Sequence, residues 1–85
     1  MRQFMYVIQD EVGIHARPAG MLVQKAKSFQ SSISLECNGK SADAAKLMAV
    51  MALGATKGME VTVTIEGEDE TKAAQDLEQF FRENF

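Results

Sequence analysis

The sequence predicts an α+β fold in which four strands and three helices follow one another in the order βαββαβα. Alternating apolar residues mark four short strands, apolar residues at three- and four-residue steps mark helices, and Asn38-Gly39 is a strong hairpin signal in mid-chain. Short strands with a central hairpin favour an antiparallel sheet covered by helices on one face. Because 85 residues suffice for one modest core, we expect residues 1–85 to form a single domain without a deep cleft.

The first two elements are a strand and a surface helix. Residues 2–8 alternate apolar and polar side chains and are expected to form the strand. The helix is expected to open between Ala16 and Pro18, because proline suits the first turn of a helix and nothing deeper. Its apolar stripe consists of Ala19, Leu22, Val23, Ala26 and Phe29. This pattern predicts a helix that lies on a core.

The middle of the chain predicts a hairpin and a short helix. The second strand is marked by Ile33, Leu35 and Cys37. The Asn38-Gly39 turn should return the chain into a brief strand over residues 40–42. Asp43 is expected to cap a helix over residues 46–53, which Gly54 stops.

The last elements are the clearest strand, over residues 60–66, and a long amphipathic helix that we expect Asp69 to cap. The apolar side of that helix consists of Ala73, Ala74, Leu77, Phe80 and Phe81. The acidic run before and into it comprises Glu66, Glu68, Asp69 and Glu70. We interpret this run as a solvated turn and helix start, with a magnesium site as the weaker alternative.

Composition excludes several classes of function. Cys37 is the only cysteine, so we expect no internal disulfide and a packing role, and one cysteine with one histidine cannot build a zinc site. With magnesium at the acidic run kept only as the weaker alternative, we expect no metal and no cofactor. No apolar run approaches the roughly 18 residues of a membrane span, so we expect a cytoplasmic protein without membrane insertion.

Charge is unevenly distributed within a net charge of −3. Residues 17–57 carry six basic and two acidic side chains, whereas residues 58–85 carry two basic and eight acidic ones. The basic part begins beside the only histidine, His15. This arrangement favours acidic protein partners for that face and argues against a nucleic-acid groove.

The segment Gly13–Gly20 carries most of the functional information. His15 lies where a loop should end and a helix begin, and Arg17 follows two residues later. The first turn of a helix has free amide hydrogens and a partial positive charge, which together bind phosphate well. We therefore predict an anion site at Ala16, Arg17 and Pro18. A lone histidine is more often an ordinary residue, but the spacing of these residue types favours the anion site.

A phosphoryl acceptor is the chemistry that this segment predicts. Neutral imidazole is a nucleophile near pH 7, and the planar fork of the Arg17 guanidinium suits phosphate oxygens. Phosphoryl transfer needs chiefly positioning and electrostatic stabilisation, so a small protein can carry the group without an elaborate pocket. A self-contained hydrolase is a weaker hypothesis. It would need a general acid or base, and the neighbouring Asp10 and Glu11 are interpreted as solvated loop acids.

The short second helix is apolar nearly all round. We expect Val50 and Leu53 to belong to the core. We expect partial exposure for Leu47, Met48 and Met51, because an adaptable methionine patch suits docking to more than one partner.

The whole chain resembles HPr, the histidine-containing phosphocarrier of the bacterial phosphoenolpyruvate-dependent sugar phosphotransferase system (PTS). The likeness rests on Gly13–Ala19, Asn38–Lys40, Leu47–Gly54, Lys57-Gly58 and Gly67–Glu70, with the first segment the most specific. The resemblance implies an open-faced β-sandwich with strand order 1-4-2-3. It also implies that His15 accepts a phosphoryl group on Nδ1 from enzyme I and passes it to the A domain (EIIA) of a sugar permease.

By the same resemblance, Arg17 balances the phosphate charge, and the docking face comprises Gly20, Leu47, Met48 and Met51. Many relatives carry a regulatory serine where this chain has Lys46, which has no hydroxyl to phosphorylate. We expect a monomeric phosphocarrier that is not an enzyme by itself. The alternative is an HPr-like regulatory module that acts on target proteins without a transport role.

Overall fold

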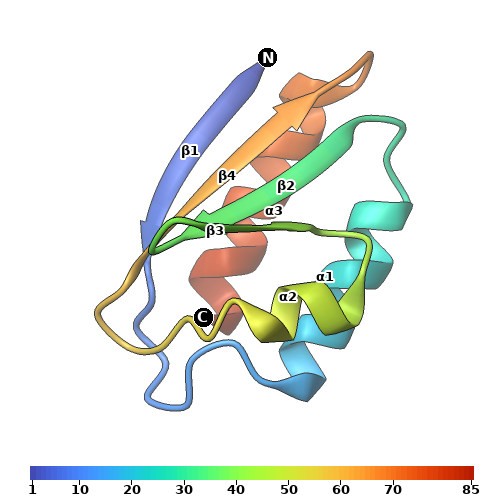
Figure 1. The fold of residues 1–85 in the computed structure, drawn as a ribbon. Coiled ribbons are helices and arrows are strands. Elements are labelled where there is room, and N and C mark those ends of the chain that lie inside the picture. Colours follow the sequence, from blue (N-terminus) through green and yellow to red (C-terminus); the bar gives the residue numbers. More distant parts are fainter.

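The computed structural model describes residues 1–85 and contains the expected seven elements (Figure 1). They are β1 (Arg2–Val7), α1 (Ala16–Lys27), β2 (Ser32–Cys37), β3 (Lys40–Asp43), α2 (Leu47–Ala52), β4 (Glu60–Glu66) and α3 (Glu70–Asn84). The strands form one antiparallel sheet in the order β1-β4-β2-β3. The predicted fold class, element order and strand order are therefore confirmed.

The three helices cover one face of the sheet and leave the other face open (Figure 1). Strand alternation decides which residues face the helices: Leu35 and Val63 are paired and fully buried, whereas Ser34, paired with Thr64, lies on the opposite side. We call that side the open face; it carries Gln3, Met5, Val7, Ser32, Ser34, Glu36, Ser41, Thr62 and Thr64. No helix has the length and apolar content that crossing a bilayer requires.

The core lies between the sheet and the helices. Its largest fully buried side chains are Phe81, Ile8, Leu22, Leu35, Ile65, Leu77, Val50, Val61, Val63 and Cys37. Phe81 of α3 contacts the rings of Phe4 and Tyr6 on β1 edge to face, with ring centroids 5.9 and 5.7 Å apart. These contacts fix α3 against the first strand. Cys37 is a free buried thiol, which confirms its packing role.

The predicted cap of the second helix is wrong. α2 begins at Leu47, with Lys46 as its N-cap residue and no side-chain cap. Asp43 lies too far upstream to reach the first turn of α2. Its carboxylate instead accepts a hydrogen bond from the N–H of Ala45 at 2.9 Å, which stabilises the turn between β3 and α2.

Asp69 occupies the predicted N-cap position of α3, but its carboxylate bonds elsewhere. It accepts hydrogen bonds from the N–H groups of Gln30 and Ser31, at 2.9 and 3.0 Å, and from the Ser31 hydroxyl. The hydroxyl bond from Ser31, followed by the amide bond from Gln30, holds the pKa of Asp69 below its ordinary value. Asp69 therefore ties the turn before α3 to the turn after α1.

The remaining acidic residues of this turn have structural partners or lie in solvent. Glu70 contacts the N-terminal ammonium of Met1 at 2.7 Å and accepts a hydrogen bond from the N–H of Gly67. The ammonium bond is the largest cause of the lowered pKa of Glu70. No three His, Cys, Asp or Glu side chains gather as a metal site would require.

Candidate functional site

The loop before α1 is held by its own backbone and by the segment after α2. The Ile14 N–H donates to the carbonyl of Ala55 at 3.0 Å, and the Gly13 N–H donates to the carbonyl of Asp10 at 3.0 Å. The carboxylate of Asp10 accepts from the N–H of Val12 at 2.8 Å. Asp10 is thus a positioning residue of the loop, where the sequence suggested only a solvated acid.

Gly13 allows the loop before α1 to lie close to the segment after α2. Its φ is +80°, a conformation that L side chains rarely adopt. A Cβ built there would lie 2.8 Å from the Cα of Thr56 and would collide with the carbonyl oxygen of Ala55. Glycine is therefore required both by the backbone conformation and by the close approach to the segment after α2.

His15 is the N-cap residue of α1. Its backbone is extended, and its carbonyl accepts the N–H of Ala19 at 2.9 Å, so the helix starts at the next residue. The imidazole makes no capping hydrogen bond and is half-exposed. The only histidine in the chain is therefore accessible at a helix start, as the sequence predicted.

The first turn of α1 carries donors next to this position in the chain. Ala16 and Arg17 are exposed, and their N–H groups lie in the first turn, where no intrahelical carbonyl is available to them. The Arg17 side chain belongs to none of the ion pairs in the protein. Pro18 is buried and has no N–H, so it contributes by fixing the backbone of this turn. The turn thus offers a guanidinium and two amides to an anion.

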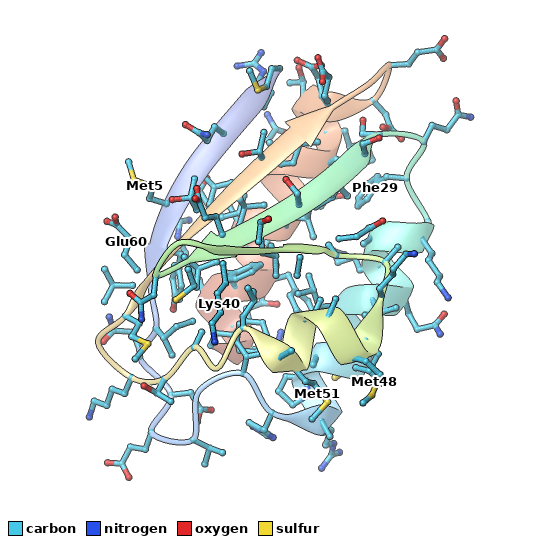
Figure 2. The ribbon with its side chains drawn as sticks, in the orientation of Figure 1. Met5, Phe29, Lys40, Met48, Met51 and Glu60 are labelled. Atoms are coloured by element: carbon cyan, nitrogen blue, oxygen red, sulfur yellow. The ribbon has the colours of Figure 1, made fainter.

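A largely apolar surface on α2 accompanies this site. Met48 is 79% exposed, and Leu47 and Met51 are each 38% exposed, while Val50 and Leu53 are buried. These exposures agree with the sequence prediction for all five residues. Figure 2 shows Met48 and Met51 projecting from α2, which packs against α1.

Two further residues of the sequence hypothesis lie on the same helices. Gly20, in α1, is half-buried, and no atom lies within 4 Å of where its Cβ would be. Lys46 is exposed at the N-cap of α2, so its charge lies at the positive end of a helix rather than on a paired acid.

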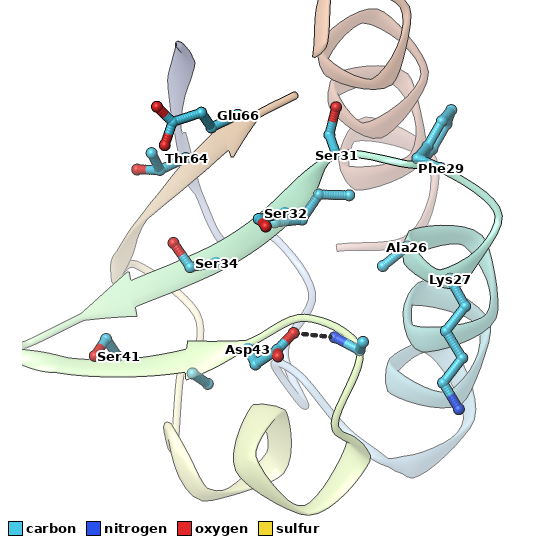
Figure 3. A pocket seen from close by; sticks show the side chains of 13 residues that line it. Ala26, Lys27, Phe29, Ser31, Ser32, Ser34, Ser41, Asp43, Thr64 and Glu66 are labelled. Atoms are coloured by element: carbon cyan, nitrogen blue, oxygen red, sulfur yellow. Dashed lines mark hydrogen bonds between the residues drawn. The ribbon is translucent and has the colours of Figure 1, made fainter. Parts of the chain in front are cut away.

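A groove of the molecule lies apart from this site. The sequence did not predict this groove, which has a volume of about 600 Å³. Figure 3 shows it beside the start of β2 and beside the turn between β3 and α2. Its lining includes Ala26 and Lys27 of the last turn of α1, whereas His15 precedes the first turn. The two features therefore lie at opposite ends of α1, about 18 Å apart along its axis.

Comparison with known families identifies the family of the chain. A family model described as the PTS HPr component phosphorylation site matches residues 2–83. The chain belongs to the HPr family. Proteins of this family are phosphocarriers of the phosphotransferase system and are not enzymes in themselves.

Solved HPr structures agree with this assignment over nearly the whole chain. The histidine-containing phosphocarrier protein of Mycoplasma is 37% identical, with a TM-score of 0.90, covering 93% of this chain and 90% of its own. The phosphocarrier protein HPr of Bacillus anthracis is 32% identical, with a TM-score of 0.87, covering 94% and 95%. Crh, the catabolite repression protein of Bacillus subtilis, is 37% identical and forms a swapped dimer; its TM-score is 0.78, covering 98% and 95%.

Proposed function

We propose that this HPr-family chain relays a phosphoryl group from phosphoenolpyruvate, through enzyme I, to EIIA domains of sugar permeases in the cytoplasm. The observation that carries the proposal is an accessible His15 imidazole at the start of α1, beside the unpaired Arg17. In this proposal residues 1–85 act as one domain.

The residues of the first turn support the proposed relay step. A ring nitrogen of His15, Nδ1 by the family resemblance, attacks the phosphorus of the phosphorylated donor, and the bond to the donor breaks. The guanidinium of Arg17 and the N–H groups of Ala16 and Arg17 stabilise the charge on the transferred group. Attack by the next acceptor reverses these roles, so the protein carries the group without consuming it.

Docking is proposed for the exposed surface formed by Gly20, Leu47, Met48 and Met51. Arg17 and Lys46 add positive charge beside these residues, which suits an acidic partner surface. Because charge steers encounter, the rate of transfer should fall as salt is raised.

The test is phosphorylation by enzyme I and phosphoenolpyruvate, followed by intact mass and acid lability. We expect one acid-labile phosphoryl group on the protein and none on His15→Ala. Arg17→Ala should slow transfer about tenfold or more, whereas Lys27→Ala, at the other end of α1, should change it less than about twofold. An adduct that survives His15→Ala would contradict the proposed carrier site.

A second candidate is an HPr-like regulatory module that acts on target proteins without transport. It is supported by Crh, which is as similar in sequence to this chain as the Mycoplasma phosphocarrier is. Absence of phosphoryl uptake from enzyme I would favour this candidate. Because Lys46 has no hydroxyl, we also expect the family's ATP-dependent serine kinase to add no phosphate at this position, which mass mapping after incubation with ATP would check.

We propose that the chain acts as a monomer, although Crh forms a swapped dimer. All six residues of β1 pair with β4 of the same chain, so the strand has a complete partner without exchange. Light scattering across a range of protein concentrations should give the monomer mass of 9.3 kDa. A mass twice as large would contradict this proposal.

A further inference from the structure

Most methionines of this protein are exposed to solvent. The exposed fractions are 74% for Met1, 61% for Met5, 49% for Met21, 79% for Met48 and 38% for Met51. The sixth, Met59, packs against the core, and its sulfur accepts a hydrogen bond from Asn38. Met48 is therefore the most exposed methionine residue of the protein, followed by Met1.

The position of Met48 separates its chemistry from the stability of the fold. α2 buries only Val50 among its six residues, so the side chain of Met48 is not part of the core. Figure 2 places Met48 and Met51 together on α2, while Met5 projects from β1 on the open face of the sheet. A change at Met48 would alter the surface beside α1 and leave the packing of the protein intact.

We propose that Met48, with Met51 beside it, is an oxidation-sensitive modification site that controls partner docking. The oxidant is a peroxide. The sulfur lone pair attacks one peroxide oxygen, the O–O bond breaks, an S–O bond forms and water leaves, so sulfur is oxidised by two electrons and peroxide is reduced. A methionine sulfoxide reductase with a thiol donor reverses the change, producing water and a disulfide.

The sulfoxide changes the docking surface from apolar to polar. An S=O group is a strong hydrogen-bond acceptor, and covering it with a partner removes its water without supplying a donor. The inference rests on the proposed function, because it assumes that this surface contacts enzyme I. It adds that peroxide slows the relay without touching His15 or Arg17.

The first experiment maps the oxidation. The protein is treated with limiting hydrogen peroxide, and peptide masses locate the added oxygen atoms. We expect Met48 among the first methionines to be oxidised and Met59 among the last, with an unchanged far-ultraviolet circular dichroism spectrum. Late oxidation of Met48, or unfolding on its oxidation, would overturn the inference whatever enzyme I does.

The second experiment measures phosphorylation by enzyme I before and after peroxide in two matched double variants. Met5→Leu/Met21→Leu keeps both methionines of α2, and Met48→Leu/Met51→Leu removes them. Each variant is compared with its own untreated sample. Peroxide should slow the first variant about fivefold to tenfold, the loss typical of one important interface residue, and the second less than about twofold.

Each result has a distinct meaning. Equal losses in the two variants, or no loss in either, would overturn the control of docking by Met48 and Met51. Recovery after treatment with the sulfoxide reductase would support it, and failure to recover would contradict a reversible site. An untreated protein that accepts no phosphoryl group would refute the proposed function, and this inference with it.

Discussion

Replacing Gly13 with alanine tests how the loop before His15 is fixed. The backbone at Gly13 has a φ of +80°, which costs an L side chain roughly 1–2 kcal/mol. The added Cβ also collides with backbone atoms of Ala55 and Thr56. If the loop moves away, the hydrogen bond from Ile14 to Ala55 is lost, which costs about 0.5–1.5 kcal/mol. We expect Gly13→Ala to lower the free energy of unfolding by about 1.5–3.5 kcal/mol.

Gly39→Ala is the matched control. Gly39 has the same φ of +80°, but no atom lies within 4 Å of its Cβ position. In this variant the free energy of unfolding should fall only by the cost of a positive φ for an L side chain, about 1–2 kcal/mol. Urea unfolding followed by circular dichroism measures the free energy of unfolding of both variants. An unchanged dependence of this free energy on urea concentration would show that stability alone has changed. Equal losses in the two variants would refute the contribution assigned to the contact between Gly13 and the segment after α2.

Three further predictions concern stability, measured by the same method. Because the pKa of Asp69 is lowered, its ionised carboxylate stabilises the fold above about pH 4, and this is lost as pH falls through the folded-state pKa. Asp69→Asn should therefore be less stable than the parent at neutral pH and approach the parent's stability in acid. A difference in stability that stays constant with pH would contradict the stabilising role of the hydrogen bonds from Ser31 to Asp69. Gly20→Ala should stabilise by roughly 0.5–1 kcal/mol, because the methyl group enters open space within a helix; a loss would indicate an unrecognised contact. Phe81→Ala should destabilise by about 3–5 kcal/mol, since its ring is fully buried; a loss below about 1 kcal/mol would mean the core refills the space.

The order of elements could be predicted because the signals were local. Alternation in the strands, the Asn38-Gly39 turn and the stripe along α1 each depend on residues near one another in sequence. The two capping predictions were less successful, for different reasons: the Asp43 carboxylate bonds locally, to the N–H of Ala45 before α2, whereas the partners of Asp69 are distant in sequence. Asp69 lies at a helix start, yet its carboxylate accepts hydrogen bonds from Ser31 and Gln30. These residues precede it by 38 and 39 positions, and no local pattern identifies them.

The candidate site shows the same division between local and tertiary information. The helix start at His15 and the exposure of Met48 could be predicted, because each follows from residue types at a known spacing. The contact of Gly13 with the segment after α2 could not, since the two are far apart in the chain and meet only in the fold. The role of Asp10 in the loop was missed because a carboxylate in a polar loop resembles a solvated one.

The open face of the sheet makes this protein straightforward to immobilise. Ser34 is exposed on that face, whereas the natural thiol of Cys37 is only 1% exposed. A Ser34→Cys substitution would provide a selective attachment point for a fluorophore or a sensor chip. Molecules anchored in this way would all present α1 and α2 outward, so successive binding partners could be measured on a uniformly oriented layer.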